Sequence, residues 1–127
     1  DVSVQAQILN LLQGLQREHG LAYLFISHNL SVVAYLAHRV AVMYRGRIVE
    51  EGEAVDLLQQ PFHPYTRLLL ASAPGRGLPQ GASTVEVYSV AGCPFAPRCA
   101  EVHPACRETN PILLDREGRR VACHLYD

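Results

Sequence analysis

The continuous apolar run from Leu21 to Ile26 is the feature that most constrains how this chain can fold. A run of this length that includes Tyr, Phe and Ile is typical of a strand buried on both faces, as in a parallel sheet. Apolar residues at helical spacing precede it from about Ser3 to His19, and Gly20 can end that helix. A helix followed by a doubly buried strand predicts the α/β class of fold.

Shorter elements are expected after this strand. Arg45-Gly46 separates two short runs of strand character, which predicts a hairpin. Pro64 suits the first turn of a helix, where a backbone N–H is not needed. The expected elements are a short helix at 30–38, strands at 40–44 and 47–50, and helices at 53–60 and 64–73.

The last third of the chain has a different composition. Pro and Gly are concentrated between Pro74 and Gly81, which indicates a linker, and Thr84 to Val90 is expected to form an isolated strand. From Gly92 onward Cys and Pro are dense and periodicity is weak, so this segment needs a staple to become ordered. We therefore predict a first domain at 1–74, a linker at 75–91 and a small irregular Cys-rich extension at 92–127.

The staple is expected to involve the four cysteines, Cys93, Cys99, Cys106 and Cys123. Five, six and sixteen residues separate successive cysteines, so the C-x-x-C spacing of common zinc modules is absent. Four thiolates can still surround one centre, either a tetrahedral zinc ion or an iron–sulfur cluster. Two disulfides are a third alternative, disfavoured in a cytosolic chain. The spacing alone leaves zinc and the cluster as equal alternatives.

Arginines flank these cysteines. Cationic neighbours favour the thiolate form and offset the negative charge of a thiolate-ligated centre. The alternative is that each arginine is solvated and balanced by a nearby carboxylate. The arginines concerned are Arg98, Arg107, Arg119 and Arg120.

Charge and residue usage exclude several functions. All 11 basic residues are Arg, and the formal net charge is −1, which argues against a nucleic-acid-binding protein. The absence of Lys excludes a phosphate-binding loop within this chain. No apolar run approaches the roughly 20 residues of a membrane span. We expect a soluble intracellular chain that is the C-terminal part of a longer protein.

His28 is the candidate chemical group of the first part, because it follows the predicted strand directly. In open α/β sheets, ligands bind outside the carboxyl ends of the strands. A neutral imidazole at that place can form a hydrogen bond with a phosphate oxygen or an attacking water. The alternative is that His28 caps the next helix or lines a loop.

The segments Leu24–Leu30 and Arg39–Gly52 resemble the end of the nucleotide-binding domain of an ABC transporter. By this resemblance the fold is the C-terminal portion of a P-loop ABC ATPase core, with one parallel strand, helices and a hairpin. Asp1 is similar to the D-loop aspartate that faces the partner subunit, and His28 to the switch histidine that senses the terminal phosphate of ATP. The resemblance therefore implies Asp1 and His28 as catalytic residues, and His28 also as a contact of ATP bound with Mg²⁺ in the parent protein.

The segment Pro61–Arg67 narrows the resemblance to the ATP-binding proteins of dipeptide and oligopeptide importers. Within it we assign His63 no role beyond local hydrogen bonding. The phosphate-binding loop, the Q-loop, the signature motif and the Walker B strand of that family are missing from this chain. ATP hydrolysis is thus expected of the parent protein, and this fragment alone is expected to be inactive.

The cysteine pattern also resembles that family. Gly92–Cys99, with Cys106 and Val121-Ala122-Cys123, is similar to a C-terminal extension that carries a [4Fe–4S] cluster in members of the family. The resemblance implies that all four cysteines are metal ligands, with zinc as the alternative. Two departures concern the local fold: Ser83–Ala91 replaces a longer proline-rich lead, and Arg119-Arg120 stands where a histidine often precedes Val-Ala-Cys.

The function implied by the resemblance is to energise import of di- or oligopeptides, or of a related small solute, through a membrane permease. The implied partners are a second ATP-binding subunit, the permease subunits and, indirectly, an extracytoplasmic solute-binding protein, and no nucleic acid. The implied location is peripheral, at the cytoplasmic face of the membrane. A metal-stapled regulatory or protein-interaction module is the alternative, followed by a zinc-dependent nucleic-acid module.

Overall fold

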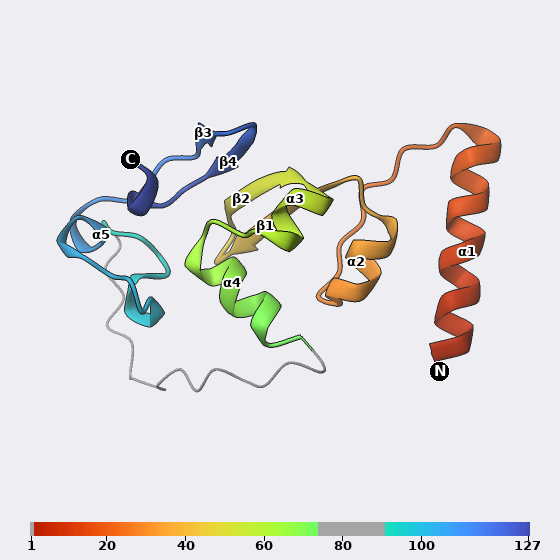
Figure 1. The fold of residues 1–127 in the computed structure, drawn as a ribbon, viewed down its shortest axis with the longest axis horizontal. Coiled ribbons are helices and arrows are strands. Elements are labelled where there is room, and N and C mark those ends of the chain that lie inside the picture. The colour runs from red at the N-terminus through yellow and green to blue at the C-terminus, as the bar shows by residue number, and fades with distance from the viewer. Residues whose placement is uncertain (1, 74–90) are drawn as a thin grey trace. The chain divides into compact units, whose positions relative to one another are not determined.

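The computed structural model describes residues 2–73 and 91–127 of the chain (Figure 1). Backbone contacts divide the chain into two compact units, residues 1–38 and residues 39–127. The predicted catalytic Asp1 and the strand expected at Thr84–Val90 lie outside the described residues. The linker expected at 75–91 also lies outside them, except for its last residue.

The first unit consists of two helices joined by an irregular segment. Helix α1 (Val2–His19) is followed by Gly20, whose φ of +63° is the left-handed conformation that glycine adopts easily at a helix C-terminus. Helix α2 (Leu30–Leu36) begins after Asn29, whose side chain accepts hydrogen bonds from two backbone N–H groups of the first turn. Both helices were predicted and are confirmed.

The strand predicted at Leu21–Ile26 is wrong for the described structure, in which this segment is irregular. Leu24 is 95% exposed and Ile26 is 91% exposed. A strand buried on both faces needs neighbouring strands for its backbone and helices over its faces. Among the strands that the structure describes, none pairs with this segment. The apolar pattern indicates a tendency to be buried, whereas the strand itself requires partners.

Strands β1 (Arg39–Tyr44) and β2 (Arg47–Glu53) form the predicted hairpin. Arg45 and Gly46 occupy the two central positions of its turn, with φ of +46° and +77°. Positive φ at both positions is typical of a type I′ turn, whose twist matches that of the strands it joins. The turn therefore explains why the short sequence Arg-Gly ends one strand and begins the next.

The C-terminal segment adds two strands to this hairpin. β3 (Leu114–Arg116) pairs antiparallel with β4 (Arg119–Val121), and β4 pairs antiparallel with β2. The resulting sheet has the order β1-β2-β4-β3. Glu50 of β2 lies opposite Val121 of β4. The α/β class is confirmed. The described sheet is antiparallel throughout, and two of its strands, β3 and β4, come from the Cys-rich segment.

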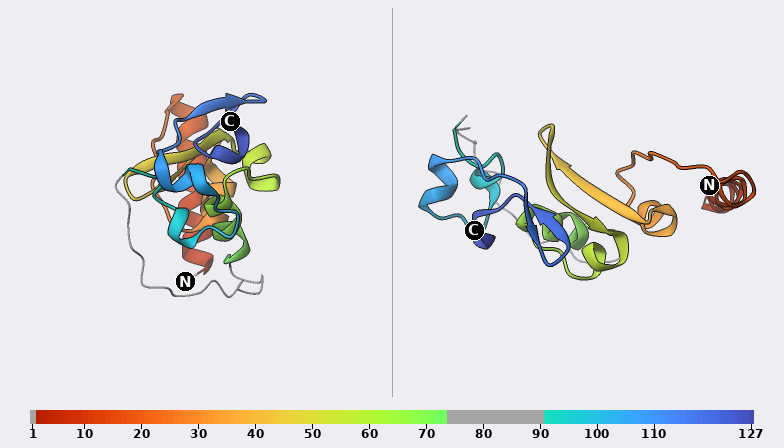
Figure 2. Two further views of the ribbon diagram at one scale, coloured as in Figure 1. Left: turned by 90° about the vertical axis from the view of Figure 1, so that its left-hand side faces the viewer. Right: turned by 90° about the horizontal axis from the view of Figure 1, so that it is seen from above.

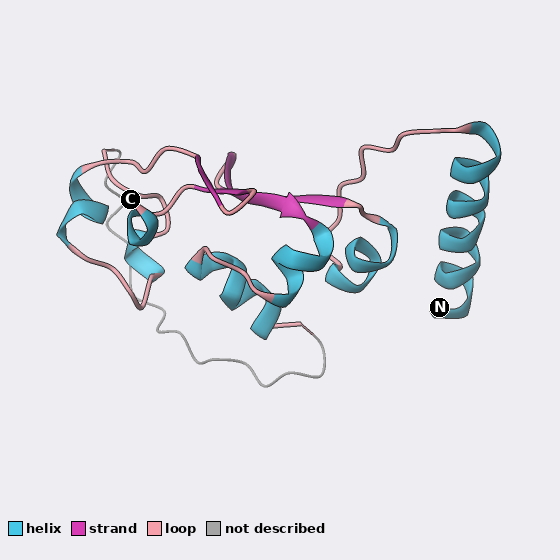
Figure 3. Ribbon diagram, turned by 45° about the horizontal axis from the view of Figure 1, so that its top comes forward, coloured by secondary structure: helices cyan, strands magenta, loops and turns pink. Residues whose placement is uncertain are grey.

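Helices α3 (Ala54–Gln59) and α4 (Pro64–Ala71), both predicted, lie on the same side of the hairpin (Figure 3). Phe95 of the Cys-rich segment packs in the same core cluster as residues of these helices and strands and is 2% exposed. Its ring meets the Tyr44 ring edge-on, with 5.3 Å between the ring centroids. The buried core of this unit consists of Val42, Tyr44, Val49, Leu57 and Phe95.

Three short helical segments complete the second unit: η1 (Ala96–Arg98), α5 (Pro104–Glu108) and η2 (His124–Tyr126). In both views of Figure 2 the C-terminus lies among these cyan and blue segments. Of the helices in the described part of the chain, none has both the length and the apolar composition to cross a membrane.

Candidate functional site

His28 lies in the loop that leads into α2 and is exposed. The residues on either side hold this loop: the Asn29 N–H donates to Ser27 Oγ at 3.0 Å, and the Asn29 side chain caps the helix. The helix cap is thus Asn29, so the capping role considered for His28 belongs to its neighbour. The His28 side chain is exposed in this loop, directly before the first turn of α2.

The four predicted ligand cysteines come from four different local structures of the second unit. Cys93 lies in the turn before η1, Cys99 directly follows η1, Cys106 lies within α5 and Cys123 follows β4. All four line one cavity and all four are free thiols, so the disulfide alternative is not realised here. The structure therefore brings together the four side chains that the sequence singled out.

The arrangement is not that of a formed metal centre. In the described ranges, no group of three or more His, Cys, Asp or Glu side chains is placed so that it could hold a metal ion. The four cysteines therefore line one cavity, but their side chains are not arranged in the geometry of metal ligands.

Backbone N–H groups already donate to three of the four sulfur atoms. Cys93 receives them from Phe95 and Ala96, Cys99 from Glu101, and Cys123 from Leu125. Burial nevertheless raises the pKa of the Cys93 and Cys99 thiols above the ordinary value of 9.0, and that of Cys123 to about 11. These thiols are therefore protonated at neutral pH, whereas a bound metal ion would deprotonate them. The N–H donors are suited to stabilise the resulting thiolates.

A close backbone approach joins the first cysteine to the third. The Cys93 N–H donates to Cys106 O at 2.8 Å. A Cβ atom placed on Gly92 would lie only 2.6 Å from that same carbonyl oxygen. Gly92 is thus required by space, because no larger residue lets the two segments approach this closely.

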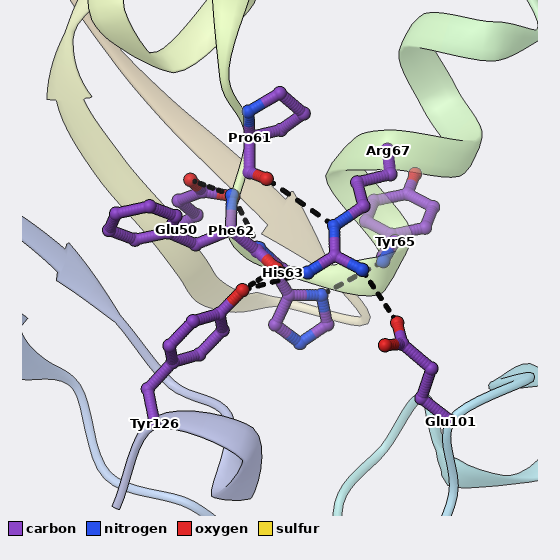
Figure 4. A network of polar contacts seen from close by, with 8 residues as sticks. All are labelled: Glu50, Pro61, Phe62, His63, Tyr65, Arg67, Glu101 and Tyr126. Carbon is purple, nitrogen blue, oxygen red and sulfur yellow. Dashed lines mark hydrogen bonds and ion pairs between the residues drawn. The ribbon is translucent and has the colours of Figure 1, made fainter.

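A buried carboxylate fixes the backbone beside this cavity (Figure 4). Glu50 has no exposed surface, and its two carboxylate oxygens accept hydrogen bonds from the backbone N–H groups of Phe62 at 2.8 Å and His63 at 2.9 Å. His63 is the cap residue of α4, and its Nδ1 accepts from the Tyr65 N–H at 3.0 Å. Burial, and next the charge of Arg67, lower the pKa of His63 from 6.5 to about 4, so its ring is neutral at neutral pH.

Arg67 connects α4 to two parts of the Cys-rich segment, at Glu101 and at Tyr126. Its guanidinium donates to Phe62 O at 2.8 Å, to the Tyr126 hydroxyl at 2.7 Å and to Glu101 at 2.7 Å (Figure 4). The Tyr126 hydroxyl in turn donates to Phe62 O at 2.9 Å. The cysteine cavity is thereby bordered by a polar network that begins at Glu50 and ends near the C-terminus.

The arginines that precede the last cysteine, Arg119 and Arg120, contact groups other than the cysteine sulfurs. Arg119 is 6% exposed, its guanidinium lies over the Phe62 ring at 3.6 Å from the centroid, and it donates to Gln60 O at 2.5 Å. Arg120 pairs with Glu51 of the neighbouring strand. Arg119 thus anchors the end of α3, and Arg120 supports the pairing of β4 with β2.

Sequence reasoning missed Glu50, and it missed the place of His63 beside the cysteines. The Phe62 N–H that binds Glu50 is twelve residues away, so no local pattern indicates the contact. For His63 a partial signal exists, because a polar residue directly before a proline suits the cap of a helix that begins with that proline. Nothing in the sequence indicates that this cap also lines the cysteine cavity.

Comparison with known proteins gives consistent results along the whole chain. Residues 49–106 match the family described as "Oligopeptide/dipeptide transporter, C-terminal region". A putative peptide import ATP-binding protein of Brucella abortus is 50% identical over 132 residues, which cover 99% of this chain and 40% of that protein. The putative oligopeptide transport ATP-binding protein YkfD of Bacillus subtilis is 46% identical, covering 99% of this chain and 42% of YkfD.

A third relative is the dipeptide transport ATP-binding protein DppF of Haemophilus influenzae, 42% identical over 100% of this chain and 42% of its own length. The chain thus spans about two fifths of the length of the curated relatives that it matches. The chain is thus similar over nearly its whole length to ATP-binding proteins named for peptide import or dipeptide transport, and residues 49–106 match the C-terminal region of the oligopeptide/dipeptide transporter family.

Proposed function

We propose that the protein is the ATP-binding subunit that energises the import of di- or oligopeptides through a membrane permease. The observation that carries this proposal is the 42–50% identity, over nearly the entire chain, to proteins named for peptide import or dipeptide transport. The partners would be a second ATP-binding subunit and the permease subunits, with a solute-binding protein acting indirectly. The subunit would lie peripherally at the cytoplasmic face of the membrane.

Within this function His28 would contact the terminal phosphate of ATP, bound with Mg²⁺, and orient the attacking water. Support comes from its exposed place in a loop that Ser27 and Asn29 hold. Asp1 would couple the two ATP sites of a dimer. Because the chain has no Lys for a phosphate-binding loop, we expect no ATP hydrolysis from residues 1–127 alone.

The test uses the protein at its full encoded length, assembled with its permease in liposomes. His28→Ala is expected to retain ATP binding and to lose most ATP hydrolysis and peptide uptake, by about 100-fold or more if the imidazole assists proton transfer. His38→Ala is the matched control, because His38 is also exposed and lies just beyond the other end of α2. Normal uptake by His28→Ala would refute the role of His28, and absence of peptide-stimulated hydrolysis in the wild type would refute the function.

We also propose that Cys93, Cys99, Cys106 and Cys123 hold a [4Fe–4S] cluster, with zinc as the alternative. Support comes from the convergence of all four thiols on one cavity and from the backbone N–H groups that donate to three of the sulfurs. When bound, the group would supply a cross-link between four chain segments, and a cluster would add one-electron redox chemistry. The four cysteines of this chain would provide the sulfur donors, and they line one cavity.

Analysis of iron, zinc and acid-labile sulfide in protein purified under nitrogen tests this assignment. Iron and sulfide in about equal amounts support the cluster. Zinc without sulfide supports the zinc alternative, in which the metal has a structural role in the Cys-rich segment. A protein with neither, purified without chelators, would refute the metal site.

A regulatory or interaction module is the second candidate function, favoured by one observation. The cysteine cavity lies in the unit of residues 39–127, whereas His28 lies in the unit of residues 1–38. Cys93→Ser would then alter assembly or its regulation and leave ATP hydrolysis intact. Equal loss of hydrolysis and assembly would argue against a separate module.

A further inference from the structure

The backbones of Cys93 and Cys106 are in direct contact. The Cys93 N–H donates a hydrogen bond of 2.8 Å to the Cys106 carbonyl oxygen. The two Cα atoms are therefore at most about 6.7 Å apart, because only one N–Cα bond and one carbonyl unit extend the path beyond that hydrogen bond. Disulfides usually join Cα atoms between about 4.4 and 6.8 Å apart. This pair thus meets the backbone condition for a disulfide.

The other cysteine pairs lack such a contact. Within residues 2–73 and 91–127, no backbone hydrogen bond joins Cys99 or Cys123 to another cysteine. The backbone N–H of Cys99 and the backbone carbonyl of Cys123 form their hydrogen bonds within the turns of η1 and η2. The fold therefore selects Cys93 and Cys106 from the four cysteines.

The side chains of the selected pair line one cavity, and both are free thiols. Burial raises the pKa of Cys93 most, and the negative charge that Cys106 would carry as a thiolate raises it further. Such an electrostatic effect weakens with distance, so it indicates that the two sulfurs are near each other. Cys106 is 7% exposed and Cys93 is only partly buried. A small oxidant would therefore reach Cys93 first.

We propose that Cys93 and Cys106 form a disulfide when the metal-free protein is exposed to a peroxide. The Cys93 thiolate attacks one oxygen of hydrogen peroxide, which breaks the O–O bond, releases hydroxide and leaves a sulfenic acid on Cys93. The Cys106 sulfur then attacks the Cys93 sulfur, and the sulfenic oxygen leaves as water with the Cys106 proton. Two thiols and one peroxide thus give one disulfide and two water molecules.

The disulfide would join the turn before η1 to α5 and close the loop of residues 93–106. In cytosolic proteins, disulfides are usually transient and catalytic or redox-sensing, which suits a subunit at the cytoplasmic face of a membrane. Oxidation and metal binding would exclude each other, because the disulfide uses two of the four sulfurs. The inference goes beyond peptide import and does not depend on the proposed metal site.

The experiment uses protein of full encoded length that is freed of metal with a chelator, reduced and then exposed to hydrogen peroxide. Remaining thiols are blocked, and disulfides are mapped by mass spectrometry after digestion with trypsin and a glutamyl endopeptidase. Cleavage after Arg98 and after Glu101 places Cys93, Cys99 and Cys106 in three separate peptides. The expected product is a linked pair of the Cys93 and Cys106 peptides, which dithiothreitol separates.

Gly92→Ala tests the backbone contact that selects the pair. A Cβ on Gly92 would lie 2.6 Å from the Cys106 carbonyl oxygen, so the disulfide is expected to form several-fold more slowly than in the wild type. Gly118→Asn is the matched control, because a Cβ at Gly118 meets open space, and it is expected to form the disulfide at the wild-type rate.

Cys106→Ser provides a second test that does not depend on how well Gly92→Ala folds. In this variant the sulfenic acid on Cys93 has lost its partner, so we expect it to accumulate and to be trapped by dimedone. In the wild type, the same treatment is expected to give the disulfide with little trapped sulfenic acid.

Three results would overturn the proposal. A disulfide from Cys93 to a different cysteine, or equally fast formation in a folded Gly92→Ala, would overturn the pairing. Retention of all four thiols after prolonged exposure to peroxide would overturn the disulfide itself. These results leave peptide import and the metal content of untreated protein unaffected, since each of those has its own measurement.

Discussion

At the scale of single residues, Glu50 shows how a buried charge can be satisfied without a basic side chain. Both carboxylate oxygens accept backbone N–H groups from the turn that precedes α4. Hydrogen bonds to an ionised group are among the strong ones, and leaving their donors unpaired in the interior is costly. Glu50 thereby holds the turn that positions His63 and Arg67.

We predict that Glu50→Gln lowers the free energy of unfolding by about 1.5–3 kcal/mol, because an amide offers one oxygen where the carboxylate offers two. The measurement is urea unfolding followed by circular dichroism. Glu53→Gln is the control, since the Glu53 side chain is 57% exposed and pairs with Arg39 at the surface. A surface pair of this kind contributes about 0–1 kcal/mol, so equal losses in the two variants would contradict the role of Glu50.

His63 gives a pH dependence whose sign follows from its environment. Burial and then Arg67 lower its pKa from 6.5 to about 4 in the folded chain. The folded state thus binds the proton less readily than the unfolded state, and the contribution to stability is complete above pH 6.5 and lost as the pH falls through about 4. Since one pKa unit corresponds to about 1.4 kcal/mol, the loss is on the order of 3 kcal/mol.

We predict that His63→Asn removes this part of the acid destabilisation in metal-free, reduced protein. The measurement is the midpoint of urea unfolding at a series of pH values between 7 and 4, in the wild type and the variant. The two curves are expected to converge as the pH falls, because protonation of the wild-type histidine cancels its advantage. Curves that stay parallel across this range would contradict the assignment.

At the scale of elements, the Cys-rich segment is ordered by contacts with elements that precede it. β4 pairs with β2, Phe95 enters the core beside Tyr44, and Arg67 binds Glu101 and Tyr126. These contacts with the sheet, the core and α4 explain how a segment with little periodicity of its own acquires a fold.

We predict that Gly92→Ala pushes Cys93 away from α5 and weakens metal retention, because the added Cβ would meet backbone atoms of Cys106 and Arg107 that cannot rotate aside. Overpacking of this kind costs about 1–3 kcal/mol. The measurements are the melting temperature and the bound metal per chain. Gly118→Asn is the control: it places a side chain at φ +78° in open space, which Asn tolerates, so full metal content in Gly92→Ala would refute the close approach.

At the scale of the whole molecule, the two units differ in how they are held together. The second unit has a buried core and a sheet, whereas Val4, Ile8 and Leu11 of α1 are each at least 50% exposed. Isolated helices without a packed apolar face are marginally stable in water. Large apolar side chains of α1 and of the segment at 21–26 are thus exposed in this unit.

We predict that, in residues 1–127 alone, backbone amides of α1 exchange with deuterium much faster than those of β2. Hydrogen exchange with peptide-level mass spectrometry measures this, and the peptides that contain Val49 serve as the internal reference. In the complete protein the amides of α1 are expected to become protected. Protection of α1 equal to that of β2 in the isolated chain would contradict this difference between the units.

The sequence by itself determined the elements that depend on near neighbours. Gly20 ends α1, Arg45-Gly46 turns the hairpin, and Pro64 begins α4. Each depends on backbone preferences and hydrogen bonds within a few residues, and these preferences are present in the unfolded chain. The four cysteines also stand out in composition and spacing, and all four line one cavity in the fold.

Only the tertiary structure decided the pairings between distant segments. Leu21–Ile26 has the composition of a strand but lacks strand partners in the described residues, whereas Arg119–Val121 has no strong strand pattern and pairs with β2. His63 lines the cysteine cavity because Glu50, α4 and Cys123 meet there. Such contacts form where distant groups can pair their backbone hydrogen-bonding groups and their charges. The free energy gained must exceed the entropy lost when the intervening loop is closed. This balance depends on the whole chain, so no local sequence pattern predicts it.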